Sequence, residues 1–185
     1  MGNFGNIEEA KKEYKMGGGE WYNFKVGENK IRIVSLFNHF GEHWDDTEKK
    51  PVLCIGKDSG CEYCKAGDRV SPKWLGWIID REDGEFKILK TGFQVIKQIS
   101  ALDESDDYGF GEDGLPKYDI VVKREGEKLK TKYTVIPGRQ DVELTEEELK
   151  KQKELKDPLE IIVAMKDKLN NEPDDSEILD EETPI

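Results

Sequence analysis

The chain has 185 residues, of which 35% are hydrophobic and 38% are charged, and its formal net charge is −12. This length fits one domain with appendages and makes two full domains unexpected. The sequence has no apolar run of about 18 residues, the length of a membrane span, and residues 1–15 lack the apolar stretch of a signal peptide, so we expect a cytoplasmic protein without membrane partners.

Acidic residues are concentrated in the last quarter of the chain. Residues 1–140 hold 23 Lys and Arg against 25 Asp and Glu, whereas residues 141–185 hold 6 against 16. The body of the protein is therefore close to neutral and can carry a basic stripe on one face. The negative net charge does not exclude a nucleic acid as partner.

The N-terminal region predicts one short helix over residues 6–16. Asn6 is a suitable N-cap, and Glu9 stands at the capping-box position three residues later. The glycines at positions 17–19 end this helix and form a flexible joint. So short a helix is marginal in isolation, and we expect it to order only when it docks on this chain or another.

The central part of the chain changes to β-strand patterns. Residues 24–36 predict a first strand, and residues 73–80 and 85–91 predict two more, joined by the hairpin signal Asp83-Gly84. Residues 38–72 lie between the first two strands and show little periodicity. A segment of this length inside a compact domain needs an organising element of its own.

A helix, a loop and two strands follow the third strand. Apolar residues recur at helical spacing over residues 93–102. Residues 103–116 are acidic and rich in glycine, which predicts a mobile loop. Residues 118–123 and 129–136 predict two further strands, joined by a turn.

The C-terminal quarter predicts helix and then disorder. A helix covers most of residues 144–170, with Thr145 as N-cap and Glu148 at the capping-box position. The dipeptide Asp157-Pro158 kinks this helix or restarts it as a second one. Residues 171–185 are acidic and contain proline, which predicts a disordered tail.

The order of these elements indicates the fold class. Five strands with a helix between the third and the fourth have the connectivity of an OB-fold barrel, so we expect a mainly β protein; a five-stranded mixed sandwich is the alternative. The predicted organisation is an N-terminal helix and joint over 1–20, an OB-fold core over 21–140 with an insertion at about 38–72, a C-terminal helix over 141–170 and a disordered acidic tail over 171–185.

All three cysteines of the chain, Cys54, Cys61 and Cys64, lie within eleven positions inside the insertion. An odd and clustered set does not suit a disulfide framework, and a reducing compartment favours metal binding. Cys61 and Cys64 form a C-x-x-C pair, whose spacing lets two thiolates of one tight turn share a Zn²⁺ ion. A redox C-x-x-C would need a βαβ context, which is absent, and two ordinary buried thiols are the other alternative.

The fourth ligand is expected among the only histidines of the chain, His39 and His43, which lie just upstream of the cysteines. We favour His43, because residues 45–48 predict a turn, and the resulting hairpin would bring His43 beside Cys54; His39 is the alternative. Four protein ligands make a closed site. We therefore expect one structural zinc ion that organises the insertion into a zinc-binding subdomain, and no catalytic zinc with an open position.

The candidate contacts to nucleic acid lie mainly on the predicted strands. In residues 73–80, alternation places Leu75, Trp77 and Ile79 on the better core face and Trp74 on the opposite face. A solvent-facing Trp74 would be a platform for base stacking, and packing in the core is its alternative role. The cations that we expect to contact phosphates are Arg32, Arg69, Lys73, Arg81, Lys87, Lys90, Lys123 and Lys132.

Several of these motifs together resemble a known family. They are Gly27-Glu28-Asn29-Lys30-Ile31-Arg32-Ile33, a His before Cys54, the pair Cys61 and Cys64, and Trp74 followed by an apolar strand that ends in Asp80-Arg81-Glu82-Asp83-Gly84. In this combination, over roughly residues 20–140, the chain resembles the zinc-containing single-stranded-DNA-binding proteins of tailed phages. The best known of these are the helix-destabilising proteins of T-even-type phages.

The resemblance implies an OB-fold with a zinc subdomain, a DNA cleft between the two, no enzymatic activity, and a role in phage replication, recombination and repair in the infected bacterial cytoplasm. The chain is much shorter than the best-known members, and its His-to-Cys and Cys-to-Cys spacings differ from theirs. Its N-terminal segment lacks the basic arm that supports cooperative binding in those relatives. Self-association along the DNA is therefore left open by the sequence.

The last twelve residues combine acidic side chains with the apolar pair Ile178-Leu179 and end in Pro184-Ile185. A solubilising tail is the simplest interpretation. The tail also resembles the acidic, apolar-tipped tails with which single-stranded-DNA-binding proteins recruit replication and recombination proteins. We expect such recruitment, and we also expect the tail to compete with DNA for the protein's own basic cleft.

Two other function classes compete with DNA binding. A zinc-dependent nuclease or deaminase would need a general base beside an open zinc ion, and the deaminase signature is absent, since Gly60 precedes Cys61 where that signature has proline. A zinc-ribbon protein-interaction module without DNA binding is the alternative function. We predict a non-enzymatic protein that binds single-stranded DNA without sequence specificity and thereby protects and organises it.

Overall fold

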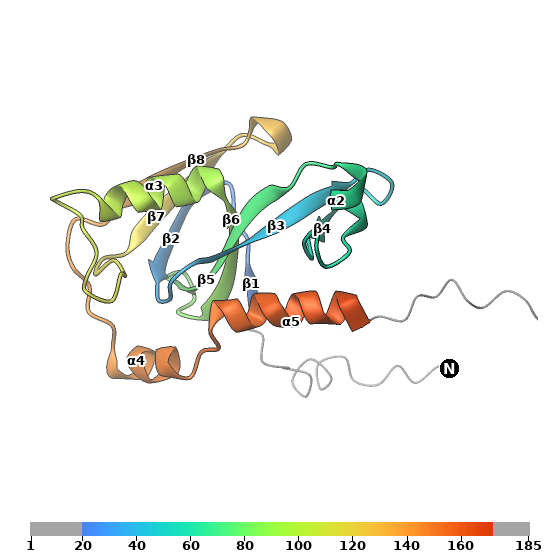
Figure 1. Ribbon diagram of the computed structural model, residues 1–185. Helices are drawn as coiled ribbons and strands as arrows, with labels where there is room; N and C mark the ends of the chain where they lie inside the picture. Colours follow the sequence, from blue (N-terminus) through green and yellow to red (C-terminus); the bar gives the residue numbers. More distant parts are fainter. Residues whose placement is uncertain (1–19, 172–185) are drawn as a thin grey trace, which may run out of the picture.

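The described part of the protein is mainly β. The computed structural model describes residues 20–171. The helix predicted over residues 6–16 and the acidic tail beyond residue 171 lie outside the described residues. Within the described range, eight strands form one mixed sheet with helices on both of its faces (Figure 1).

Strands and helices follow one another along the chain as Figure 1 labels them. The strands are β1 (Glu20–Tyr22), β2 (Gly27–Ile33), β3 (Asn38–Asp45), β4 (Lys50–Leu53), β5 (Ser71–Asp80), β6 (Phe86–Gly92), β7 (Ile120–Glu125) and β8 (Lys132–Pro137). The helices are α2 (Glu62–Ala66), α3 (Phe93–Asp103), α4 (Glu146–Lys153) and α5 (Pro158–Asn171), with a short 3₁₀ helix, η1, at Lys128–Lys130. No helix of the described range is long and apolar enough to cross a membrane.

The strands pair along the path β1-β6-β5-β2-β7-β8. Only β1 and β6 pair in parallel along this path, and the other neighbours are antiparallel. The long strand β5 shares one of its edges between β2 and β3, and β3 then pairs with β4 away from the main path. Among residues 20–171 no pairing joins β8 to β1 or β6, so the sheet is open and a closed five-stranded barrel is not seen.

The inner face of the sheet, which carries Ile31, Ile78 and Leu89, is covered by α3. Alternate residues of β2, β5, β6 and β7 point to this face, as the twofold repeat of a strand requires. Val95 and Ile99 of α3 pack against them and are almost fully buried. This face therefore holds the larger of the two cores.

The outer face of the sheet carries a second core under α5. Leu75, Trp77 and Ile79 of β5 lie there, as predicted, and Ile162 of α5 packs on them with 2% of its surface exposed. The indole Nε1 of Trp77 donates to the carbonyl of Lys156 at 2.8 Å, which ties the start of α5 to the sheet. Both faces of β5 are therefore covered over most of its length.

The outer edge of β8 is covered by side chains of α3. Gln98 accepts a hydrogen bond from the backbone N–H of Val135 at 3.0 Å and donates to the carbonyl of Tyr133 at 2.9 Å. Gln94 accepts from the N–H of Tyr133 at 3.0 Å. These two glutamines occupy the positions that a neighbouring strand would take in a closed barrel.

Most predicted elements are confirmed, with some changes at their ends. The helix predicted over 93–102 is α3, and the capping box of Thr145 and Glu148 starts α4. Residues 144–170 are mostly helical, as predicted. The chain leaves the first helix after Lys153 and restarts at Pro158, which confirms the second of the two expectations for the dipeptide Asp157-Pro158. The strand predicted from residue 129 begins only at Lys132, since η1 precedes it.

Candidate functional site

Four side chains of the segment predicted as an insertion converge on one point. The Nε2 atom of His43 lies 3.5 Å from Sγ of Cys61 and 3.4 Å from Sγ of Cys64. Sγ of Cys54 lies 3.4 Å from Sγ of Cys64, and all four potential ligand atoms fall within 4.8 Å of one another. The structure thus brings together the four residues that the sequence proposed as ligands, whereas His39 is exposed elsewhere on β3.

The hairpin of β3 and β4 places His43 and Cys54 side by side, as predicted. His43 faces Val52 across this antiparallel pair, and the N–H of Cys54 donates to the carbonyl of Gly41 at 2.9 Å. The turn between the strands is held by Asp45, whose Oδ1 accepts from the backbone N–H groups of two turn residues. A side chain at residue 41 would meet Val70 and Cys54, so glycine there allows their close approach.

Cys61 and Cys64 lie at the start of α2. Cys61 is the N-cap residue, and its carbonyl accepts from the N–H of Lys65 at 3.0 Å, so both thiols emerge from one helical turn. Glycines with positive φ, Gly60 and Gly67, stand at the two ends of this short helix. Figure 1 shows β3, β4 and α2 extending beyond the main sheet. We call this part, residues 38–70, the cysteine lobe.

The imidazole of His43 is fixed by its surroundings. Only 2% of His43 is exposed, and its ring stacks on Tyr63 with centroids 5.4 Å apart and an interplanar angle of 18°. The hydroxyl of Tyr63 donates to Oδ2 of Asp45 at 2.7 Å, which anchors the stacking partner to the hairpin turn. Nε2 is the ring nitrogen that faces the thiols and is available to a metal ion, and Nδ1 is buried without a partner among the described residues.

The thiols of Cys61 and Cys64 have pKa values that are shifted in opposite directions. Burial raises the pKa of the Cys61 thiol, but the N–H groups of Cys64 and Ile55 hydrogen-bond to its sulfur and bring its pKa below the ordinary value. The hydrogen bond to Cys54, together with burial, raises the pKa of Cys64 to about 12. A bound cation would instead lower the pKa of Cys64, because coordinated thiols lose their proton.

The donor set of three thiols and one imidazole is compatible with a structural metal ion. A cation at the centre would gain four ligands from the protein, two from the hairpin and two from α2, and would join the two halves of the cysteine lobe. No family model, curated protein or solved structure matches this chain. Function is therefore inferred from the geometry and charge of the chain's own residues.

An aromatic pair lies where the cysteine lobe meets the main sheet. Trp74 is half-buried at the end of the inner face, and its ring lies 6.2 Å from that of Phe93, with an interplanar angle of 39°. Phe93 is 60% exposed, and His39 lies directly opposite Trp74 across the pair of β3 and β5. We call the group formed by the half-buried Trp74 and the exposed Leu36, His39 and Phe93 the Trp74 surface.

A small hollow with a mostly apolar lining opens beside the Trp74 surface. Its volume is about 180 Å³, and Phe37, Trp74 and Ile96 are among its lining residues. The ring of Phe37 lies flat on Gly76, where an added Cβ would approach ring atoms at 2.9 Å. Strand alternation predicted that Trp74 faces solvent. The structure agrees with this only in part, since Phe37 covers this face of β5 at Gly76 and the face is open only at Trp74.

Four predicted phosphate contacts are engaged inside the protein. Lys87 is 8% exposed and lies between the carboxylates of Asp80 and Asp83, and Lys90 pairs with Glu42. The prediction that these two lysines are free is wrong. Alternation along β6 turns Lys87 to the covered inner face, and Lys90, on the opposite face, reaches the buried carboxylate of Glu42. The remaining two are Arg81, held by Asp119 and Glu148, and Arg32, which is 6% exposed.

The other four predicted cations lie on different surfaces. Arg69 is exposed in the cysteine lobe, and Lys73 points away from Trp74 because the two are adjacent in β5. Lys123 and Lys132 lie on β7 and β8, on the side opposite to the inner core. Lys97, which the sequence analysis missed, is exposed one helical turn after Phe93, and its i+4 spacing from that residue was the available signal.

Proposed function

We propose that the chain binds single-stranded DNA without sequence specificity, through the Trp74 surface, and catalyses no reaction. The observation that carries this proposal is the aromatic pair of Trp74 and Phe93, which is open to solvent beside an apolar hollow. Aromatic side chains stack on any base, because every base has a π-face. Such a platform gives affinity without reading the sequence.

Charge around the platform supports the same function. Lys97 is exposed one helical turn after Phe93, and Arg69 is exposed in the cysteine lobe; neither forms an ion pair with a described residue. His39 adds an imidazole next to the ring of Trp74. Cations beside stacked bases are suited to contact the phosphates that link those bases.

The strand order supports an OB-like architecture as the scaffold. Counted from β2, the strands β2, β5, β6, β7 and β8 lie in the spatial order 3-2-1-4-5, with α3 between the third and the fourth. We propose that this is a partly open OB barrel whose last seam is filled by Gln94 and Gln98 of α3. OB barrels of this kind bind nucleic acid across one face of the sheet.

The metal ion that we propose is a single Zn²⁺ with a structural role. Three thiolates and one imidazole are a common ligand set for zinc, and four protein ligands leave no open position for a reacting water. Such an ion would hold together the cysteine lobe, whose strand β3 places His39 opposite Trp74. Mass spectrometry of the purified protein is expected to find one zinc per chain.

The wider role proposed here is protection and organisation of single-stranded DNA in phage replication, recombination and repair, in the cytoplasm of an infected bacterium. The resemblance noted in the sequence carries this part of the proposal. Recruitment of replication or recombination proteins by the acidic tail belongs to it as well, and that tail lies outside the described residues.

Tryptophan fluorescence during titration with oligo-dT of about 16 nucleotides tests the proposal. We expect quenching whose affinity falls steeply with salt, because bound phosphates release counterions from the DNA. Removal of one stacking platform costs about 1–3 kcal/mol, so Trp74→Ala should weaken binding about 5- to 150-fold. The salt slope should stay nearly unchanged, since this substitution removes no charge.

Trp44→Ala is the matched control, because Trp44 is 55% exposed but lies on the hairpin of the cysteine lobe. Its affinity for oligo-dT should equal that of the unchanged protein. If the folded, zinc-loaded protein shows no response at low salt, the DNA-binding proposal fails and an interaction module built on the cysteine lobe becomes the better account.

A further inference from the structure

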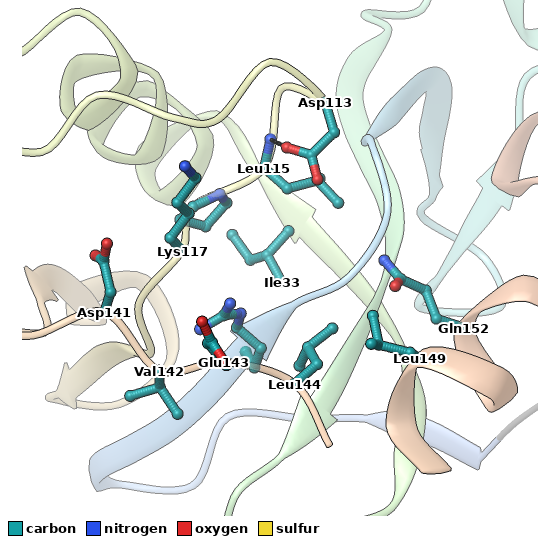
Figure 2. A pocket seen from close by; sticks show the side chains of 12 residues that line it. Ile33, Asp113, Leu115, Lys117, Asp141, Val142, Glu143, Leu144, Leu149 and Gln152 are labelled. Carbon is teal, nitrogen blue, oxygen red and sulfur yellow. Dashed lines mark hydrogen bonds between the residues drawn. The ribbon is translucent and has the colours of Figure 1, made fainter. Parts of the chain in front are cut away.

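A second, larger pocket lies next to the hollow beside Trp74, and Ile33 and Leu115 line both of them. Its volume is about 480 Å³, and its walls come from β2, the loop before β7, residues 141–144 and α4. Figure 2 shows Ile33 in the middle of its labelled side chains, with Asp113 and Leu115 on one side and Leu144 and Leu149 on the other. This size falls within the range of small-ligand sites.

Arg32 lines this pocket, and one of its terminal nitrogens has no hydrogen-bond partner among the described residues. Its side chain is 7% exposed, and Nη1 is buried without a hydrogen bond to any described residue. The nearest carboxylate oxygen to Nη1, Oδ1 of Asp119, lies 3.8 Å away, which is beyond hydrogen-bond length. Buried polar groups are almost always satisfied, so a buried guanidinium in this state indicates a missing acceptor.

Arg32 competes with two other cations for one carboxylate. Arg32, Arg81 and Lys30 all lie within 4.0 Å of Asp119, and Oδ1 of Asp119 accepts its hydrogen bond from Nε of Arg81 at 3.0 Å. A monoanionic group placed beside Arg32 would supply the missing acceptor.

The walls of the pocket are apolar, whereas its rim is charged. Leu115, Leu144 and Leu149 give the walls apolar surface. At the rim stand the carboxylates of Asp113, Asp141 and Glu143, none of which pairs with a cation in the described range, together with the exposed side chain of Lys117. A ligand that fits these features has an anionic end, an apolar body and a positive charge near the entrance.

We propose that this pocket binds an apolar residue that bears a free α-carboxylate and a nearby positive charge. The carboxylate would accept hydrogen bonds from two N–H groups of Arg32. The apolar side chain would lie against the three leucines, and the positive charge would face the carboxylates at the rim. Both the C-terminal residue of a basic peptide and a free apolar amino acid have this chemistry. This inference does not depend on DNA binding at the Trp74 surface.

The rim argues against two other occupants. Three carboxylates at the entrance repel a polyanion, so a DNA strand is disfavoured there. The apolar residue Ile185 of this chain is disfavoured as well, because the acidic run at residues 180–182 just before it would meet the same rim. A basic sequence before the terminal residue is the complementary choice.

Amide and arginine Nε–H NMR signals of the full chain test the proposal during titration with the peptide acetyl-Lys-Lys-Gly-Leu. We expect shifts of the Arg32 Nε–H signal and of the amides of Leu144 and Leu149. The same peptide with a C-terminal amide should bind at least tenfold more weakly, because it lacks the carboxylate. A titration with free leucine separates the two sources, and shifts of the same signals would assign the site to the amino acid.

Two variants with matched exposure identify the pocket. Leu149→Asp places a fourth carboxylate at the pocket and should abolish binding of the free-acid peptide, whereas Val163→Asp on α5 should leave it unchanged. Leu149 is 43% exposed and Val163 is 48% exposed, so neither substitution removes a core residue. Arg32→Lys keeps the charge but loses the two-pronged donor, and it should also weaken binding about tenfold or more.

Three results would overturn the inference. One is equal binding of the acid and amide peptides, which would mean that no carboxylate is recognised. Another is that neither peptide nor leucine at about 10 mM, tenfold above a weak Kd of 1 mM, shifts the Arg32 signal. The last is that oligo-dT shifts the Arg32, Leu144 and Leu149 signals and the peptide does not, which would make the pocket part of the DNA path.

Discussion

Single charged side chains hold elements of this protein against one another. Glu148 accepts from Arg81 at 2.6 Å and also from the backbone N–H of Thr145 at 2.8 Å, so one carboxylate caps α4 and holds it against the sheet. Burial acts to raise the pKa of Glu148, but these hydrogen bonds outweigh burial and leave its pKa below the ordinary value. The ionised form therefore stabilises the fold.

Replacement of Glu148 by Gln should lower the free energy of unfolding by about 1–2 kcal/mol at pH 7, since a charged hydrogen-bond partner is lost. The folded pKa lies below the unfolded one, so this stabilisation is present above about pH 4.5 and is lost as pH falls through the folded pKa. The deficit of the variant should thus shrink in acid. Urea unfolding at several pH values measures it.

Glu147→Gln is the control for this prediction, because Glu147 is exposed and pairs only with Lys151 in the described range. Its stability should match the unchanged protein within about 0.5 kcal/mol at every pH. A deficit of Glu148→Gln that is the same at pH 7 and in acid would show that the charge of Glu148 contributes nothing.

The environment of single residues was only partly predictable from the sequence. The convergence of His43 with the cysteines followed from local spacing, because a hairpin and one helical turn fix it. The burial of Lys87 did not, since strand alternation separates two faces but cannot tell which face another element covers. Burial acts to lower the pKa of Lys87, but the hydrogen-bonded carboxylates of Asp80 and Asp83 outweigh burial and raise this pKa above its ordinary value. The ammonium also lies 5.8 Å from the centre of the Tyr22 ring.

Among the elements, α3 combines two functions on different faces. Its buried residues pack on the inner face of the sheet, and its glutamines cover the edge of β8. Helical spacing of the apolar residues predicted the helix. The contact of polar side chains with a strand edge far along the chain leaves no local pattern and could not be predicted.

Gln98→Ala should speed hydrogen exchange at the amide of Val135, because that N–H loses its acceptor. Gln94→Ala should do the same at the amide of Tyr133 and spare Val135. Each variant should lose about 1 kcal/mol of stability, the net value of a typical hydrogen bond. Equal exchange rates in both variants and in the unchanged protein would mean that the edge of β8 is protected in another way.

At the scale of the whole molecule, the described residues are organised by two apolar cores and one polar cluster. The cores fix the main sheet between α3 and α5, whereas the cysteine lobe packs Phe40 and Leu53 on the outer core and is otherwise centred on the four-residue cluster. The order of strands and helices followed from periodicity and turn signals. The parallel pairing of β1 with β6 was missed, because a strand of three residues carries too little pattern to be recognised.

Removal of the metal should unfold the cysteine lobe and leave the main sheet folded. After chelation at neutral pH, amides of residues 42–66 should lose their protection from hydrogen exchange, whereas those of Ile78 and Ile120 should keep it. Cys64→Ser should behave like the chelated protein. Full protection of the lobe after complete loss of the metal would contradict a structural role for the ion.

The central claim is that single-stranded DNA binds on the Trp74 surface, and ultraviolet cross-linking to oligo-dT followed by mass spectrometry of the digested protein tests it most directly. The account predicts adducts on the peptides that contain Trp74 and Phe93, and their loss when Trp74 and Phe93 are both replaced by Ala. Adducts confined to peptides of the opposite side, which carry Lys123 and Lys132, would contradict the account, and so would the absence of adducts from the folded, metal-loaded protein.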